Sequence, residues 1–342
     1  MAYKRLIQFS CVAAVALGLW TLISIPVQPT FRQYFVSRFD LARVSYKIPN
    51  SMSSTVKIVC VSDTHNDDFS SKIPDGDIFI HAGDMTDFGT LEELQKAYDW
   101  IASLPHKTKI VVAGNHDFGL DSKHPNFLPE TVKLFTSDAA RAARINYLDR
   151  EVQTFTNYTT TSSDDPELRV YGNPCQPEFI GKPYAFIYKP YPSDTSAEAW
   201  KTAPTQEDNA HIWVMHSPPL NRLDSINQKY KDLGLTGCKV QADKIATAKP
   251  ILCVFGHYHF SRGVERVKWL EDGVGIEKSE ILSMSAERRL EEGRAGPASL
   301  SEFNFSDLEV GRETIFINAA WKTMDKTPGA ATNDPIVITL RL

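Results

Sequence analysis

Eight short runs of β-branched and apolar residues, each followed by a polar turn, constrain this sequence more than any other feature. They lie at residues 56–62, 77–82, 109–114, 168–172, 211–216, 251–256, 314–319 and 336–342. Continuous apolar runs of this length are typical of buried strands. Helical patterns at about 91–104, 130–144 and 240–248 lie between several of the runs, and Thr90 with Glu93 forms a capping-box pattern. This alternation predicts an α/β domain built on more than one sheet.

Polar side chains of a restricted kind follow five of these runs. Ligands of α/β sheets bind beyond the carboxyl ends of the strands, where loops from separate strands converge. The five post-strand blocks supply carboxylates, an amide and imidazoles, which together suit divalent zinc, manganese or iron. The side chains are Asp63, His65, Asp84, Asn115, His116, His216, His257 and His259. We therefore expect a metal site at this edge of the sheets.

A glycine precedes Asp84, Asn115 and His257, and we expect it to let the backbone turn sharply so that the next side chain points into the site. Five of the nine histidines fall in the post-strand blocks, in one order and with carboxylates between them. A single Asp-x-His or Gly-Asp pair is common by chance, whereas the complete series is not. The other four histidines are interpreted as structural: His81, His106, His124 and His211.

The five blocks have the form D-x-H, G-D, G-N-H-D, a lone His and G-H-x-H, and in this order they resemble the calcineurin-like metallophosphoesterases. Local runs such as VSDTHND, HAGDMTDFGT and VFGHYH resemble most the MPPED-type subgroup of metallophosphoesterase-domain proteins. The resemblance runs from about Val56 to the C-terminus, apart from a charged segment at 267–312. It implies a four-layer α/β/β/α sandwich with two mixed sheets face to face, in one domain over 55–342.

The resemblance also implies two divalent metal ions, of manganese, iron or zinc. Two groups of three side chains would each hold one metal, and one carboxylate would bridge the pair. The first group is Asp63, His65 and His259, the second is Asn115, His216 and His257, and the bridging carboxylate is Asp84. Two metals that share an anion and a water or hydroxide provide an in-line nucleophile for phosphorus.

His116 matches the family's histidine that binds no metal, and it would stabilise the transition state or protonate the leaving oxygen. Asp117 could orient the ring of His116 and keep it protonated, or it could be an ordinary turn carboxylate. These two residues are the candidate catalytic groups.

The implied activity is hydrolysis of a small phosphodiester or a nucleotide-like phosphate. A protein Ser/Thr phosphatase is the runner-up, disfavoured because the second block continues as Met85-Thr86-Asp87 and lacks the Asp-Arg-Gly run of those enzymes. The alternative from another class is a membrane-tethered, non-catalytic interaction module on the same fold, which would use the segment 267–312 to bind its partner.

An uncharged, mostly apolar stretch at 6–27 follows Lys4 and Arg5. A helix of about 20 apolar residues spans a bilayer, whereas a cleaved signal peptide usually has a shorter apolar core. We therefore expect residues 1–28 to be a hydrophobic helix that anchors the chain in a membrane, ahead of a linker at 29–54. The flanking charges do not determine which side of the membrane the domain faces.

The overall charge of -5 gives no electrostatic reason to expect a nucleic acid polymer as partner. Five scattered cysteines do not make a disulfide framework. The segment 267–312 is rich in charged residues, and we expect it to be a solvated, partly helical insertion.

Overall fold

The computed structural model describes residues 55–162, 164–178, 181–190, 193–226, 237–271, 275–293, 301–324 and 332–342. All of them belong to one compact unit, Ile48–Leu342. The predicted anchor at 6–27 and the linker at 29–54 lie outside the described residues, so both remain predictions. None of the helices in the described part has the length and apolar character that crossing a membrane requires.

Each of the eight apolar runs forms a strand, as predicted. These strands are β1 (Thr55–Val61), β2 (Ile78–Ala82), β3 (Thr108–Val112), β6 (Leu168–Asn173), β9 (Ile212–Met215), β10 (Leu252–Phe255), β14 (Glu313–Asn318) and β15 (Ile336–Arg341). Further strands lack a continuous apolar run, because they are short or lie toward the edges of sheets. They are β4 (Ile145–Tyr147), β5 (Glu151–Phe155), β7 (Gln176–Pro177), β8 (Ile187–Tyr188), β11 (Gly263–Trp269), β12 (Ile276–Met284) and β13 (Glu302–Phe305).

Within the described residues, the strands form a six-stranded sheet, a seven-stranded sheet and the small β7–β8 pair. The six-stranded sheet has the order β13-β15-β1-β2-β3-β4, in which β1 to β4 run parallel. The seven-stranded sheet has the order β12-β11-β14-β10-β9-β6-β5, in which β14, β10, β9 and β6 run parallel. The carboxyl ends of the central strands of each sheet therefore lie along one edge.

Alternate residues of the central strands face two different cores. Ile58 and Cys60 of β1 belong, together with Val214 and Val254 of the other sheet, to a core that both sheets share. Val59 faces the opposite way, into a second core. This period of two is what a strand buried on both faces requires.

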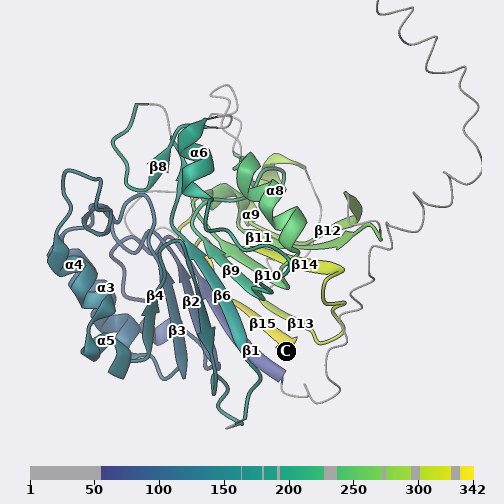
Figure 1. Ribbon diagram of the computed structural model, residues 1–342, viewed down its shortest axis with the longest axis horizontal. Helices are drawn as coiled ribbons and strands as arrows, with labels where there is room; N and C mark the ends of the chain where they lie inside the picture. Colours follow the sequence, from purple (N-terminus) through teal and green to yellow (C-terminus); the bar gives the residue numbers. More distant parts are fainter. Residues whose placement is uncertain are drawn as a thin grey trace, which may run out of the picture. The chain divides into compact units, whose positions relative to one another are not determined.

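Helices cover the outer faces of the two sheets (Figure 1). The second core joins the six-stranded sheet to α3 (Leu91–Ser103), α4 (Pro129–Thr136) and α5 (Asp138–Ala142). A third core joins the seven-stranded sheet to α6 (Asp194–Ala199) and α8 (Lys239–Ala248). The predicted mixed α/β fold on more than one sheet is thereby confirmed.

The predicted helix at 130–144 is two helices. Ser137 ends α4 and begins α5, where its side chain accepts a hydrogen bond from the backbone N–H of Ala140. A serine that caps a new helix competes with helix continuation. Three short 3₁₀ helices complete the described elements, η1 (Ser70–Lys72), η2 (Phe118–Leu120) and η3 (His259–Ser261).

The charged segment at 267–312 is partly helical, as expected, through α9 (Ala286–Glu291). It also contributes to both sheets, which the charge pattern did not indicate. β12 is an edge strand of the seven-stranded sheet, and β13 lies at the edge of the six-stranded sheet beside β15. Edge strands tolerate charged residues, which also protect the edge from further pairing.

The capping box predicted at Thr90 and Glu93 is present at the start of α3. We expect Thr90→Ala to lower the free energy of unfolding by about 1 kcal/mol, because it leaves the backbone N–H of Glu93 without its acceptor. Urea denaturation measures the change. Thr136→Ala is the control, since its hydroxyl bonds only to the preceding turn at Val132; an equal loss in both variants would contradict the cap's contribution.

Candidate metal centre

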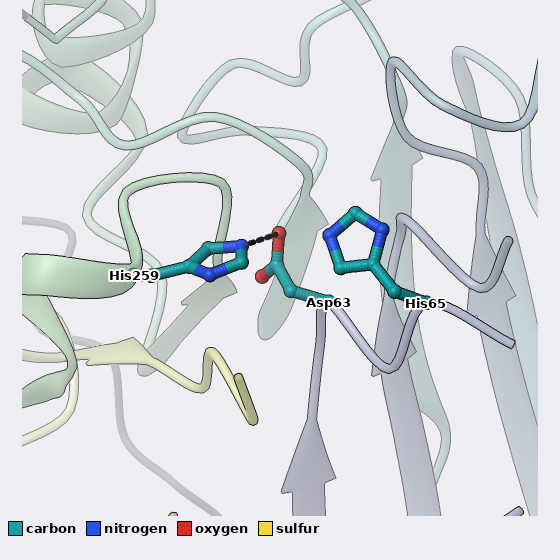
Figure 2. Close-up of side chains that lie close together, drawn as sticks. All are labelled: Asp63, His65 and His259. Carbon is teal, nitrogen blue, oxygen red and sulfur yellow. Dashed lines mark ion pairs between the residues drawn. The ribbon is translucent and has the colours of Figure 1, made fainter. Parts of the chain in front are cut away.

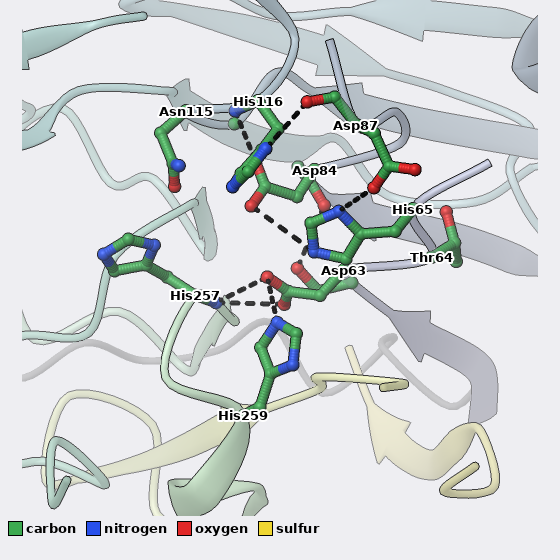
Figure 3. A network of polar contacts seen from close by, with 12 residues as sticks. Asp63, Thr64, His65, Asp84, Asp87, Asn115, His116, His257 and His259 are labelled. Carbon is green, nitrogen blue, oxygen red and sulfur yellow. Dashed lines mark hydrogen bonds and ion pairs between the residues drawn. The ribbon is translucent and has the colours of Figure 1, made fainter. Parts of the chain in front are cut away.

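The five post-strand blocks meet at the common edge of the two sheets. Asp63 and His65 follow β1, Asp84 follows β2, Asn115 and His116 follow β3, His216 follows β9, and His257 and His259 follow β10. Figure 3 labels these side chains, apart from His216, within one network of polar contacts. The structure thus brings together every metal ligand that the resemblance implied.

The first group consists of Asp63, His65 and His259 (Figure 2). One potential ligand atom from each of the three side chains lies within 4.8 Å of the others. His259 Nε2 is 3.3 Å from Asp63 Oδ1, and the rings of His65 and His259 are 5.5 Å apart between centroids. Carboxylate and imidazole atoms at this spacing can bind one cation.

The second group consists of Asp84, His216 and His257, with their potential ligand atoms again within 4.8 Å of one another. His216 Nε2 is 3.4 Å from Asp84 Oδ1 and 2.9 Å from Asn115 Oδ1. Asn115 therefore joins this group, as the resemblance implied. The amide oxygen of Asn115 could supply a further neutral ligand.

Asp84 lies between the two groups. Its Oδ1 faces His216 Nε2 of the second group, and its Oδ2 is 3.8 Å from His65 Nε2 of the first group. One carboxylate with its two oxygens directed at separate groups has the geometry of a bridging ligand.

Three of the histidines share one hydrogen-bond pattern. The Nδ1–H of His216 donates to the carbonyl of Ala82 at 2.9 Å, and the Nδ1 of His65 and His259 lie 3.2 and 3.5 Å from the carbonyls of Thr86 and Thr323. A carbonyl can only accept, so the proton of each neutral ring is on Nδ1 and the lone pair is on Nε2. Each of these Nε2 atoms faces a carboxylate oxygen.

An imidazole lone pair and the carboxylate oxygen that it faces repel each other unless a positive charge lies between them. Imidazole ligands of metals are commonly oriented by a hydrogen bond from the other ring nitrogen, as here. The residues present therefore fit two divalent cations, one in each group. The histidine nitrogens, the carboxylates and the Asn115 amide would supply the ligands.

The pKa values of His216 and His65 show the same demand for positive charge, whereas that of His257 does not. Burial alone would lower the pKa of His216, but the adjacent Asp84 carboxylate outweighs it and raises the pKa to about 9. Burial also lowers the pKa of His65, but the hydrogen bond to Asp87 and the charge of Asp84 outweigh it and raise the pKa to about 8. Burial and the neighbouring His216 lower the pKa of His257 to about 3, so this ring is neutral at pH 7.

The ligand loops carry left-handed backbone at residues that rarely adopt it. Asp63, His65, Asn66, Asp84 and His257 have φ between 46° and 65°. Such conformations cost free energy and persist only where the surrounding structure imposes them. Their concentration at one place supports a functional site there.

The glycines of the blocks serve close packing more than turning. Of the three, only Gly83 has a positive φ, of 96°. A Cβ at Gly256 would collide with Asp63 Oδ2, and one at Gly114 would collide with Asp84 Oδ1. The expected sharp turn is therefore found only at Gly83. At Gly114 and Gly256 a glycine is needed because the backbone lies directly against a carboxylate of the site.

His116 lies beside the first group, with its ring 5.0 Å from that of His65 between centroids. Its backbone N–H donates to Asp84 Oδ1 at 2.8 Å, and its Nδ1–H donates to the carbonyl of Asp87 at 2.8 Å. The ring is thus oriented by Asp87, which leaves Nε2 of His116 available to a substrate.

Asp117 does not orient the ring of His116, in contrast to one of its two predicted roles. Its carboxylate accepts hydrogen bonds from the backbone N–H of Gly114, at 2.7 Å, and of Thr86, at 3.0 Å, and from the Thr86 hydroxyl at 2.7 Å. Asp117 is a turn carboxylate that joins the loops after β2 and β3. Burial and the nearby Asp84 charge raise its pKa to about 6.

Asp87 is the functional residue that the sequence reasoning missed. Its Oδ1 is 3.2 Å from His65 Nδ1, and its other oxygen accepts a hydrogen bond from Asn66 at 2.8 Å. Through its side chain and its carbonyl, Asp87 orients both His65 and His116 (Figure 3). The only signal in the sequence is a second aspartate three residues after Asp84.

We expect Asp84→Asn to lower the occupancy of both metals, because the amide removes the negative charge that the two groups share. Asp63→Asn should chiefly lower the occupancy of one metal, since Asp63 belongs to the first group alone. Inductively coupled plasma mass spectrometry of protein dialysed against manganese measures both. Equal metal loss in the two variants would contradict the bridging position of Asp84.

We expect Gly256→Ala to lower metal content while the fold is retained, because the added Cβ displaces Asp63. Gly311→Ala is the control for backbone strain alone, since that glycine has a φ of 76°, where alanine is strained, and no atom within 4 Å of an added Cβ. Metal analysis and circular dichroism are the measurements. Full metal content in Gly256→Ala would show that close approach at this glycine is unimportant.

Comparison with known proteins agrees with this geometry. A family model described as calcineurin-like phosphoesterase matches residues 56–271. The probable rhamnogalacturonate lyase C of Emericella nidulans is 37% identical over 217 residues, which cover 63% of this chain and 18% of that protein. Metallophosphoesterase domain-containing protein 1 of Homo sapiens is 32% identical over 215 residues, which cover 61% of this chain and 62% of that protein.

A UPF0046 protein of Caenorhabditis elegans is 31% identical over 219 residues, which cover 63% of this chain and 68% of that protein. The chain spans less than two thirds of the length of the Emericella and human relatives. The family match and the post-strand blocks lead to one conclusion: the chain belongs to the calcineurin-like phosphoesterase family, with MPPED-type and UPF0046 proteins among its relatives.

Proposed function

We propose that the chain hydrolyses a small phosphodiester or nucleotide-like phosphate with two divalent metal ions. The observation that carries the proposal is the shared orientation of His65, His216 and His259. Each directs its Nε2 at a carboxylate and keeps its Nδ1 on a backbone carbonyl. Three imidazole rings oriented in this way are difficult to explain by packing alone.

The residues that would hold the metals fall into the two groups described above. One ion would be bound by Asp63, His65 and His259. The other ion would be bound by Asn115, His216 and His257, and Asp84 would bind both ions. Manganese, iron and zinc all suit this mixture of oxygen and nitrogen ligands. When bound, two such ions neutralise charge on a phosphoryl group and lower the pKa of a coordinated water.

His116 would act on the oxygen of the leaving group. Its Nδ1–H is held by the Asp87 carbonyl, so Nε2 is the atom that can carry a proton toward the substrate. The ring is only partly buried and lies next to the first group. A general acid must be within hydrogen-bond reach of the atom that it protonates, and this position allows it.

The charges around the centre favour a phosphodiester over a phosphoprotein. In the described part of the chain, no lysine or arginine forms an ion pair with the ligand residues or with His116. Asp87 instead places a carboxylate beside His65. A phosphodiester carries one negative charge, so it needs fewer protein cations than the dianionic phosphate group of a phosphoprotein. The Ser/Thr phosphatase alternative is therefore weaker.

A non-catalytic module would have little use for both the ligand set and a histidine oriented beside it. The attachment to a membrane through residues 6–27 is part of the proposal, and it would place the reaction near a lipid surface. The substrate is proposed to be a small molecule. A nucleic acid polymer is not expected, because the chain carries a net charge of -5.

We expect His116→Ala to slow hydrolysis of bis(p-nitrophenyl) phosphate by roughly 10²- to 10⁴-fold, the usual contribution of a general acid or base. Metal content should stay at the wild-type value, because His116 belongs to neither ligand group. Release of p-nitrophenol by manganese-loaded protein, measured with metal analysis, tests both statements.

The matched control is His211→Ala, which removes a partly buried histidine whose Nδ1 accepts a hydrogen bond from the backbone N–H of Arg169 and which lies outside both metal groups. Loss of metal together with turnover in His116→Ala would assign His116 to the ligand set. Absence of metal-dependent turnover in the folded wild-type chain would favour the interaction module.

A further inference from the structure

His81 is a buried histidine for which the metal centre described above gives no role. It lies in β2, three residues before Asp84, and none of its surface is accessible to solvent. Its ring lies in the core between the six-stranded sheet and α3, with the rings of Phe79 and Trp100 at 6.5 and 6.0 Å between centroids. An apolar side chain would fill such a position without the cost of burying two ring nitrogens. The histidine therefore needs a reason other than packing.

The ring of His81 makes one hydrogen bond within the described part of the chain. Its Nε2 is 2.9 Å from the hydroxyl oxygen of Thr64, whereas its Nδ1 has no partner among the described residues. Burial lowers the pKa of His81 to about 3, so the ring is neutral at pH 7 and carries a single proton. Because buried N–H groups without an acceptor are rare, the proton is assigned to Nε2, which then donates to Thr64.

Thr64 stands between two residues of the first metal group, Asp63 and His65. Both neighbours have left-handed backbone, with φ of 57° and 46°. Such backbone persists only where the surrounding structure imposes it. Thr64 is itself completely buried, and its contact with His81 joins the loop after β1 to the side chain of a β2 residue.

Backbone hydrogen bonds join the same two segments on either side of Thr64. The N–H of Asp63 donates to the carbonyl of Gly83 at 2.9 Å, and the N–H of His65 donates to the carbonyl of Asp84 at 3.1 Å. With Thr64 bonded to His81, three consecutive residues of the loop are attached to β2 or to the loop that follows it. The directions in which the Asp63 and His65 side chains leave the loop are then determined.

We propose that His81 is a positioning residue of the metal centre, which acts through Thr64 on the ligands Asp63 and His65. The bond between the two buried side chains holds the loop after β1 in the left-handed form that directs both ligands at one cation. This inference rests on the metal centre of the proposed function, and it adds a residue that lies outside both ligand groups. A local polar group in an apolar core, kept at a cost in stability, is expected where it serves a functional site.

The first test measures manganese binding to the metal-stripped 342-residue chain by isothermal titration calorimetry. We expect His81→Leu and Thr64→Val each to weaken the binding of one manganese ion by roughly 10-fold, the lower end of what loss of a residue behind a metal ligand costs. The other ion should bind as it does to the wild-type chain, because its ligands Asn115, His216 and His257 lie in other loops. Equal weakening of both ions would overturn the proposal.

Two further variants serve as controls for the size and chemistry of the side chain. His81→Gln should recover most of the lost affinity, because its amide nitrogen can donate to Thr64 from nearly the position of Nε2. His106→Leu should bind both ions with wild-type affinity. His106 is also buried, and its ring lies 5.6 Å from that of Phe79, but it precedes β3 and so lies at the end of the sheet opposite the metal centre. A loss in His106→Leu equal to that in His81→Leu would overturn the proposal.

The double variant Thr64→Val/His81→Leu separates positioning from a merely structural role. Both substitutions remove the same bond, so the double variant should weaken manganese binding no more than either single variant does. It also leaves neither partner of the bond unpaired in the core, so the metal-free protein should melt no lower than the wild-type protein. A lower melting temperature with unchanged manganese affinity, measured by circular dichroism and calorimetry, would assign His81 a purely structural role.

Hydrolysis of bis(p-nitrophenyl) phosphate by the wild-type protein separates this inference from the function on which it rests. Manganese-dependent turnover together with unchanged metal binding in His81→Leu would overturn the positioning role and leave the phosphoesterase standing. Absence of turnover with any divalent metal, together with weakened manganese binding in His81→Leu, would overturn the phosphoesterase and leave the positioning role standing.

Discussion

Two buried carboxylates, Asp63 and Asp84, impose the requirement that organises this structure. A buried carboxylate costs several kcal/mol unless donors and positive charge surround it. Part of that compensation is backbone: the N–H of His257 donates to Asp63, and the N–H of His116 donates to Asp84. The remainder comes from imidazoles around them, whose Nε2 lone pairs then need a cation of their own. The strand ends, the left-handed loops and the glycines all serve to bring these groups to the two carboxylates.

Much of this arrangement follows from local sequence. The central strands are buried on both faces, so their residues are continuously apolar and all eight runs could be predicted. Parallel strands place their carboxyl ends together, which is why residues as distant in sequence as Asp63 and His257 could be predicted to meet. The capping box of α3 was predictable because it depends only on residues 90 and 93.

Other features depend on contacts that no local pattern contains. β12 and β13 are charged edge strands, whose pairing is decided by the neighbouring strand and not by their own composition. The role of Asp87 arises because the loop after β2 passes between His65 and His116, which only the fold brings together. The turn position of Asp117 has the same origin, since its partners Thr86 and Gly114 lie in two different loops.

The ligands of each metal group come from both sheets. Asp63 and His65 follow a strand of the six-stranded sheet, whereas His259 follows a strand of the seven-stranded sheet, and the second group is divided in the same way. A bound cation would therefore cross-link the two sheets, and neither sheet alone could supply all of its ligands. The free energy of binding at such a cross-link adds to the free energy of unfolding. Metal binding would thus stabilise the packing of the two sheets against each other, so loss of the metals would lower both the activity and the stability of the domain.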